Sequence, residues 1–139
     1  MARTVNEVMT HDPVVVEPTT TLTEAARFMR DSDVGPVLVA EGGSLTGIVT
    51  DRDIVVRAIA DGRDPSSTKV SDVVSGSVTT VTPDQDASEA ARIMREQDVR
   101  RLPVVQDGRP VGIVAIGDLA VELDDESALA DISASSPNN

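Results

Sequence analysis

The chain has 139 residues, 40% hydrophobic and 26% charged, which suffices for the core of one ordinary domain or of two small units sharing a core. Its net charge of −12, from 24 acidic residues against 12 Lys and Arg, opposes nonspecific binding to nucleic acid or to an anionic membrane. It has no apolar run near the ~20 residues of a membrane span, no signal-peptide pattern and no cysteine, and these features predict a cytoplasmic location.

An internal repeat dominates the sequence. Residues 5–56, shifted by 65, align with residues 70–121 without a gap, and 19 of the 52 positions are identical. Chance would give roughly three or four identities, so a duplication is the sound interpretation. We therefore assign a first repeat to residues 5–62, a linker to 63–69, a second repeat to 70–123 and a frayed acidic, polar tail to 124–139.

The first repeat predicts five successive elements after a short helical turn. A capping-box pattern of Thr21 with Glu24 marks the start of its amphipathic helix, and Pro18 ends the strand before it. The predicted order is a turn at 5–9, a strand at 14–16, the amphipathic helix, hairpin strands at 37–40 and 45–50, and a helix at 51–60.

The second repeat predicts the same series, and Asp86 with Glu89 resembles the capping box. Its predicted order is a turn at 70–74, a strand at 79–81, an amphipathic helix, hairpin strands at 102–106 and 111–115, and a helix at 117–123. Apolar residues at helical spacing predict the packed faces of the two amphipathic helices: Leu22, Ala25, Ala26 and Met29, then Ala87, Ala90, Ala91 and Met94.

Each repeat is thus a βαββα unit of about 55 residues, too small to be very stable alone. We therefore predict an α+β fold, an α/β sandwich in which the two repeats pack around a pseudo-twofold axis. The clefts between the repeats would then be lined by corresponding parts of both.

The point where strand gives way to helix is the strongest candidate for a site. In Gly47-Ile48-Val49 a buried strand ends, and Thr50 and Asp51 are placed to cap the helix that follows. Free backbone N–H groups and a hydroxyl at such a junction suit anions, and Asp53 adds a carboxylate for sugar hydroxyls. A plain helix cap is the alternative interpretation, and capping and ligand binding are compatible.

Two βαββα units that each end in Gly, two apolar residues, a Thr or Ser position and Asp resemble a tandem pair of CBS domains, the Bateman module. The resemblance covers about residues 5–123 and includes the segment Arg100-Arg101-Leu102-Pro103-Val104-Val105. The chain is similar to stand-alone actinobacterial modules of this kind. The resemblance implies binding of an adenosine-containing ligand: AMP, ADP or ATP first, then NADH, S-adenosylmethionine or cyclic di-AMP.

By this resemblance, the first ligand site uses Asp53 for ribose hydroxyls and Thr50 for phosphate or ribose, with Arg52 at the helix start. The opposite repeat supplies its first strand and the start of its second strand: Val78, Thr79, Thr80, Arg100, Arg101, Leu102 and Pro103. Arginine–phosphate hydrogen bonds are strong because the charges assist them. Ion pairs with Asp98 or Asp51 are the alternative for the two arginines of the opposite repeat.

The second site keeps its ribose acceptor, Asp118, but Ala115 replaces the Thr, and no basic residue matches Arg100 and Arg101. We expect this site to be weak, empty or suited to a less charged ligand. Its predicted contacts are Asp118, Val15, Val34, Gly35 and Pro36.

Residues for catalysis or for metal binding are not recognisable. His11 is the single histidine, no P-loop or G-x-S-x-G motif is present, and Asp124-Asp125-Glu126 lacks calcium-loop spacing. We therefore predict a regulatory protein and not an enzyme, with no catalytic cofactor and no metal. We expect a homodimer formed through the amphipathic helices and an effector protein as partner. The alternative is a ligand-free dimeric scaffold.

Overall fold

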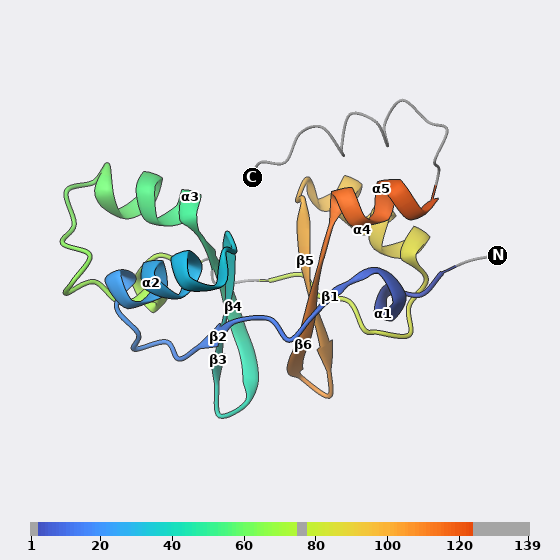
Figure 1. Ribbon diagram of the computed structural model, residues 1–139, viewed down its shortest axis with the longest axis horizontal. Helices are drawn as coiled ribbons and strands as arrows, with labels where there is room; N and C mark the ends of the chain where they lie inside the picture. Colours follow the sequence, from blue (N-terminus) through green and yellow to red (C-terminus); the bar gives the residue numbers. More distant parts are fainter. Residues whose placement is uncertain (1–2, 75–77, 124–139) are drawn as a thin grey trace. The chain divides into compact units, whose positions relative to one another are not determined.

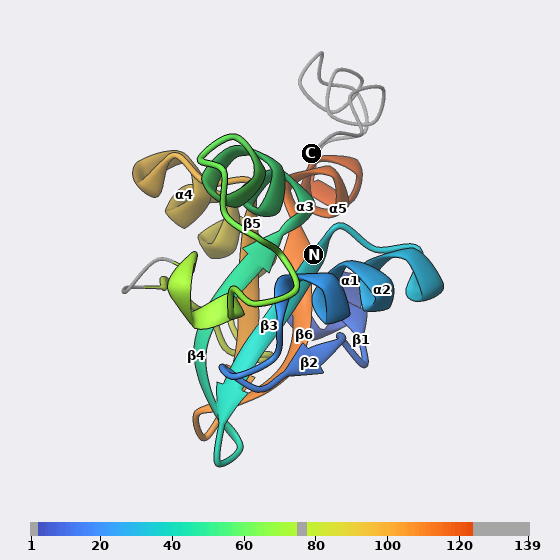
Figure 2. The same cartoon turned by 90° about the vertical axis from the view of Figure 1, so that its left-hand side faces the viewer.

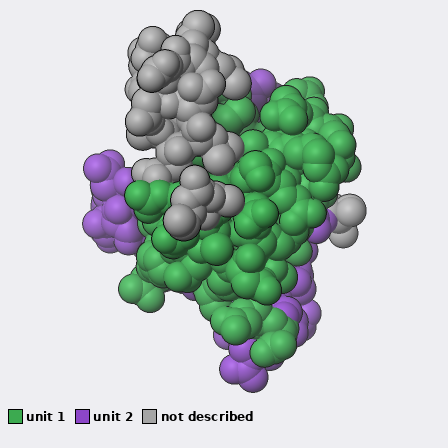
Figure 3. Space-filling model, turned by 90° about the vertical axis from the view of Figure 1, so that its right-hand side faces the viewer, with its two compact units in different colours: residues 1–12, 79–107, 111–139 green, residues 13–78, 108–110 purple. Residues whose placement is uncertain are grey.

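The computed structural model describes residues 3–74 and 78–123, with side-chain environments up to Leu119 (Figure 1). The chain divides into two compact units, coloured separately in Figure 3. Of the described residues, unit 1 holds 3–12, 79–107 and 111–123, and unit 2 holds 13–74, 78 and 108–110. The tail predicted at 124–139 lies outside the described residues.

Unit 2 is built on a three-stranded sheet in the order β2-β3-β4, and Figure 2 shows β3 and β4 side by side. β2 (Val15–Val16) runs parallel to β3 (Pro36–Glu41), and β3 forms an antiparallel hairpin with β4 (Ser44–Thr50). Gly42 and Gly43 form the hairpin turn with φ angles of +61° and +87°, the conformation that a tight hairpin turn requires. The three predicted strands of the first repeat are therefore confirmed.

The helix of the first repeat, α2 (Leu22–Ser32), starts as its sequence predicts. Thr21 accepts from the Glu24 N–H at 3.2 Å, and Glu24 Oε1 accepts from the Thr21 N–H at 3.0 Å, so the capping box is formed. Leu22, Ala25 and Met29 are buried against the sheet. Ala26 is exposed, so its prediction as a packing residue was wrong; it lies just outside the buried stripe.

The second helix of the first repeat is not regular. The prediction was one helix over 51–60, but α3 (Asp51–Asp53) is a single turn followed by a π-helix, η1 (Ile54–Ile59). Ile54 and Ala58 point into the core of unit 2, whereas Val55, Val56 and Ile59 are at least half exposed. π-Helical turns are rare and occur frequently at functional sites.

Unit 1 contains the other sheet, in the order β1-β6-β5. Its strands are β1 (Thr10–His11), β5 (Arg101–Gln106) and β6 (Arg109–Ala115), and its helices are α1 (Val5–Val8), α4 (Ala87–Gln97) and α5 (Ile116–Leu123). The strand predicted at 79–81 is absent: Val81 forms only an isolated parallel bridge with Val104. This bridge lies at the β5 edge of the sheet; at the opposite edge, β6 pairs antiparallel with β1.

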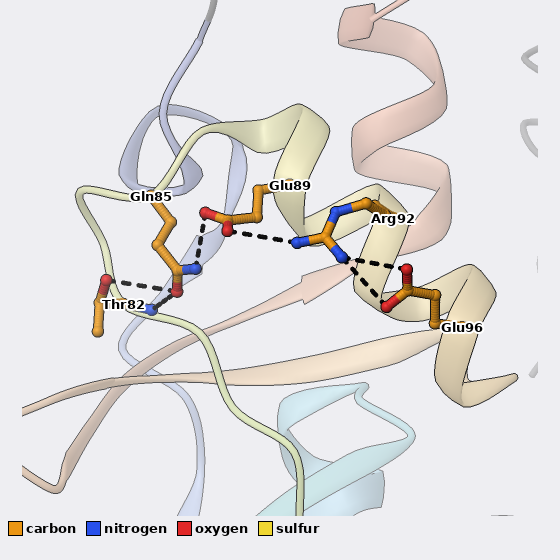
Figure 4. A network of polar contacts seen from close by, with 5 residues as sticks. All are labelled: Thr82, Gln85, Glu89, Arg92 and Glu96. Atoms are coloured by element: carbon orange, nitrogen blue, oxygen red, sulfur yellow. Dashed lines mark hydrogen bonds and ion pairs between the residues drawn. The ribbon is translucent and has the colours of Figure 1, made fainter.

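Helix α4 begins without the predicted capping box, because the Asp86 side chain makes no cap hydrogen bond. Its first turn is held by a polar network, shown in Figure 4. Gln85 Nε2 donates to Glu89 Oε1 at 2.9 Å, and Arg92 bridges Glu89 and Glu96 at 3.4 and 3.1 Å. The exposed face of this helix is therefore strongly polar, while Ala87, Ala90 and Met94 are buried; Ala91 is only half buried.

The opening turn of each repeat packs into the unit built on the other repeat. Val5 and Met9, from α1 and its end, are buried in the core of unit 1. Val70 and Val73, from the 3-10 turn η2 (Val70–Asp72), are buried in the core of unit 2. Each unit is therefore completed by a segment that lies outside the repeat supplying its hairpin.

The structure confirms the mixed α and β fold class, with two three-stranded sheets and the helices of both repeats. The packing of the two units about a pseudo-twofold axis stays a prediction. No helix of the described residues combines the length and apolar character needed to cross a membrane.

Candidate functional site

The junction between β4 and α3 forms a reciprocal pair of hydrogen bonds. Thr50, in extended conformation, accepts at Oγ1 from the Asp53 N–H at 3.1 Å. Its own N–H donates to Asp53 Oδ2 at 2.9 Å. The plain capping function considered from the sequence is thus formed, and it fixes the Asp53 carboxylate beside the hydroxyl.

The Asp53 carboxylate keeps one oxygen for further partners. Oδ1 lies 3.9 Å from Arg57 Nε, within ion-pair range but beyond hydrogen-bonding distance. The side chain of Asp53 is 28% exposed, so the carboxylate is partly shielded yet reachable. An ionised carboxylate with an available lone pair is suited to accept from a sugar hydroxyl.

Neighbouring backbone joins this junction to the start of β3. The Asp51 N–H donates to the Gly35 carbonyl at 3.1 Å, and Pro36 is the register partner of Thr50. The structure therefore brings Gly35 and Pro36, predicted for the second site, next to Thr50 within unit 2. Arg52 lies exposed, and its backbone N–H donates to Asp51 Oδ1 at 2.9 Å.

The corresponding junction in unit 1 is formed at the end of β6. The Ala115 N–H donates to Asp118 Oδ2 at 3.0 Å, the same bond as between Thr50 and Asp53, but Ala115 has no hydroxyl to return it. The Ile116 N–H donates to the Arg100 carbonyl at 2.9 Å, which places Arg100 beside this second junction. The two junctions are unequal, as the sequence predicts.

Burial raises the pKa of Asp118 above its ordinary value, and the hydrogen bond from the Ala115 N–H offsets part of that rise. The carboxylate of the second junction is therefore disfavoured in its charged form. The second junction therefore combines a desolvated carboxylate with a missing hydroxyl.

The remaining predicted contacts differ in accessibility within their own units. Leu102 is only 1% exposed, and the Pro103 carbonyl accepts from the Val81 N–H at 3.1 Å, so both belong to the packed core and its backbone bonding. The other predicted contacts are partly or fully exposed: Val15, Val34, Val78, Thr79, Thr80, Arg100 and Arg101. That one ligand contacts residues of both repeats stays a prediction.

Arg57 is a residue of this site that the sequence reasoning missed. A sequence signal existed, since Arg57 follows Asp53 by four residues, the spacing of ion pairs on a helix. No group of three or more metal-binding side chains occurs within residues 3–74 and 78–123.

Comparison with known proteins identifies the family. The sequence profile described as "CBS domain" matches residues 5–59 and again residues 70–125. The CBS domain-containing protein YhcV of Bacillus subtilis is 42% identical over 125 residues, covering 89% of each chain. Hypoxic response protein 1 of Mycobacterium tuberculosis is 35% identical over 121 residues, covering 86% of this chain and 85% of that protein.

Solved structures agree with this. The crystal structure of Hypoxic Response Protein I with two coordinated zinc ions matches with a TM-score of 0.77 at 34% identity, covering 87% of this chain and 99% of that one. The domain pair of protein MJ0100, in complex with 5′-methylthioadenosine and S-adenosyl-L-methionine, matches with a TM-score of 0.77. Its identity is 24%, so this likeness concerns the fold. The predicted similarity to a stand-alone module is confirmed by the near-complete coverage of the first protein.

Proposed function

Because the chain belongs to the CBS-domain family and carries two copies of the domain, we propose that it is a regulatory protein which binds an adenosine-containing nucleotide. The observation that carries this proposal is the Thr50–Asp53 junction, with its paired hydrogen bonds and the second carboxylate oxygen left to accept. Asp53 would accept from ribose hydroxyls, and the Thr50 hydroxyl would donate to phosphate or ribose.

The first site is the stronger of the two in this proposal. It has a hydroxyl at Thr50 and a nearby cation at Arg57. In the second repeat Ala115 lacks the hydroxyl, the position that matches Arg57 is Glu122, and burial makes the charged form of Asp118 less favourable than in water. AMP, ADP and ATP are therefore the first candidate ligands. NADH, S-adenosylmethionine and cyclic di-AMP follow, and the S-adenosyl-L-methionine held by MJ0100 supports including that ligand.

The regulatory step is a shift in population. A bound nucleotide favours whichever arrangement of the chain or of its oligomer binds it more tightly, by typically about 1–3 kcal/mol. An effector protein reads that arrangement. No catalytic step is included, and the family supplies no reaction. A cytoplasmic location is part of the proposal, because it would give access to these ligands.

Titration of the full chain with the six ligands, followed by thermal unfolding, tests the proposal. A ligand at 100 times its dissociation constant adds about 2.7 kcal/mol to the stability of the folded state. We expect one of AMP, ADP or ATP to raise the unfolding temperature. If none of the six ligands does so, the nucleotide proposal fails.

Variants locate the binding. Asp53→Asn keeps an acceptor for the Thr50 N–H but removes the charge, and we expect it to weaken binding at least tenfold. Thr50→Ser keeps both cap and hydroxyl, so it should bind normally. Asp61→Asn changes an exposed carboxylate in a turn and is the matched control. Equal binding by wild type and Asp53→Asn would remove this junction from the site.

Exposed apolar side chains favour a second function, assembly with another copy of the chain. Phe28 on α2 is 47% exposed, and Val55 and Ile59 on η1 are 58% and 50% exposed. We propose that α2 and η1 form the homodimer surface, which keeps one of the two amphipathic helices expected from the sequence and leaves out α4, whose exposed face is polar. If nucleotide binding fails while dimerisation holds, the ligand-free scaffold becomes the better description.

A further inference from the structure

A single guanidinium connects the Asp53 carboxylate with the turn that opens the second repeat. Arg57 Nε lies 3.9 Å from Asp53 Oδ1, and Arg57 Nη1 donates to the Val73 carbonyl at 3.2 Å. Both partners lie in unit 2. A hydrogen bond from a charged donor is stronger than one between neutral groups, so the link to Val73 is more than incidental contact.

A second observation shows that this turn is fitted closely to the strand before the site. A Cβ added at Gly47 would lie 3.2 Å from Val74 Cβ, tighter than most real contacts. Val70 and Val73 are 0% and 4% exposed in the core of unit 2. The turn is therefore held by the core on its apolar side and by Arg57 on its polar side.

The geometry at Asp53 leaves room for a ligand. Since 3.9 Å is too long for a hydrogen bond, Arg57 orients the carboxylate by its charge without occupying Oδ1. The position that corresponds to Arg57 in the repeat, residue 122, is Glu, so the sequence provides this cation in the first repeat only.

We propose that Arg57 is a positioning residue which holds the Asp53 carboxylate toward the ligand and transmits ligand binding at this carboxylate to the turn 70–74. This inference rests on the proposed function, because it needs a ligand at Asp53. The turn leads along the chain toward Val78, one of the predicted ligand contacts. A change at Asp53 would thereby reach the beginning of the second repeat.

Amide hydrogen exchange of the full chain without ligand tests the link itself. The Val73 and Val74 N–H groups both donate to the Val70 carbonyl at 3.1 Å, so they report on the turn. We expect Arg57→Gln to accelerate their exchange about tenfold, the effect of losing one charged hydrogen bond. Arg57→Lys should restore part of the protection, and Arg63→Gln, at an exposed arginine, should have no effect.

The Ala25 N–H, bonded to Thr21 within unit 2, reports on unfolding of the unit as a whole. If Arg57→Gln also accelerates exchange of the Ala25 N–H, the whole unit is destabilised. The milder Arg57→Lys variant then replaces it in the comparison at Val73 and Val74. Unchanged exchange at Val73 and Val74 in both variants would overturn the proposal.

Titration with ATP tests the transmission. We expect ATP to slow exchange at Val73 and Val74 in the wild type but not in Arg57→Gln, whose affinity should fall about tenfold while Arg57→Lys stays between the two. Wild-type affinity in Arg57→Gln, or full ATP protection of its turn, would overturn the positioning role.

If the wild-type protein binds none of the six ligands, the proposed function fails, but the link between Asp53 and the turn can still be tested. The test is then amide hydrogen exchange of the Asp53→Asn variant. If the carboxylate is linked to the turn, this variant accelerates exchange at Val73, and adding Arg57→Gln gives less than the product of the two effects. Independent effects, or none for Asp53→Asn, would overturn the proposed link.

Discussion

At the scale of single residues, the two junctions differ in how they treat a negative charge. Each carboxylate accepts one backbone hydrogen bond, Asp53 from the Thr50 N–H and Asp118 from the Ala115 N–H. The Asp53 N–H also donates to the Thr50 hydroxyl, and Asp53 lies near a guanidinium, whereas Ala115 has no hydroxyl. Burial raises the pKa of Asp118, so the folded chain holds that proton more firmly than the unfolded chain does. The resulting stabilisation is present below the ordinary pKa of an aspartate and is lost as pH rises through the raised value.

Replacing Asp118 by Asn should therefore flatten the pH dependence of stability in this range. The amide still accepts from the Ala115 N–H but does not ionise, so we expect a gain over wild type at neutral pH. The carboxylate is only partly buried, and the gain should stay below about 1 kcal/mol after solvent screening. Urea unfolding at acidic and neutral pH measures it, with Asp61→Asn as control; a loss of stability at neutral pH would contradict the assignment.

At the scale of elements, the glycine that precedes each helix junction serves packing. The Cβ of an alanine at Gly112 would lie 2.6 Å from Met9 Sδ and 2.8 Å from the Thr10 carbonyl oxygen. At Gly47 the nearest atom would be Val74 Cβ, at 3.2 Å. In both units the missing side chain lets an opening turn lie directly against a strand.

Gly112→Ala should destabilise the chain by about 1–3 kcal/mol, because backbone at Thr10 has to move. Gly47→Ala should cost less, since the valine side chain needs to shift by only a few tenths of an ångström. The two variants control for each other in urea unfolding, as both add one methyl group to a strand. Equal costs, or a larger cost at Gly47, would contradict this reasoning.

Much of the element order was predictable because alternating and helical apolar patterns determine which face is buried. The π-helix could not be predicted from this pattern. It buries Ile54 and Ala58, and a regular α-helix would bury the same two residues, so the apolar spacing does not distinguish the two kinds of helix. The strand predicted at 79–81 is reduced to a single bridge between Val81 and Val104 of β5, while β1 lies at the opposite edge of the sheet, beside β6.

For the candidate site, the repeat directs attention to Thr50, Asp53 and Asp118, and the structure forms two cap hydrogen bonds at the first junction and one at the second. Ligand binding at either junction stays a prediction. The contact of Arg57 with Val73 was hidden, because these residues are 16 positions apart and no local pattern joins them. Which residues of the two repeats contact the same ligand depends on how the two units pack, and the spacing of residues in the sequence does not specify that packing.

At the scale of the whole molecule, the exposed apolar side chains of α2 and η1 contrast with the polar face of α4. Changing Val55 and Ile59 together to Glu should leave the core intact, as both are at least half exposed. We expect the double variant to run as a 14.6 kDa monomer in light scattering while the wild type runs as a dimer. Arg95→Glu on α4 is the control; a dimer that survives the double substitution would exclude this surface.

The exchange of opening turns has a consequence for the order of folding on the ribosome. Unit 2 lacks Val70 and Val73 until the chain has been made beyond its first hairpin and helix, so its core stays incomplete while those residues are still in the exit tunnel. Val5 and Met9 emerge well before their own partners in the second repeat, Leu102 and Val114. The opening turn of the first repeat is thus made early and buried late, and its apolar side chains stay exposed on the nascent chain until the second repeat has been made.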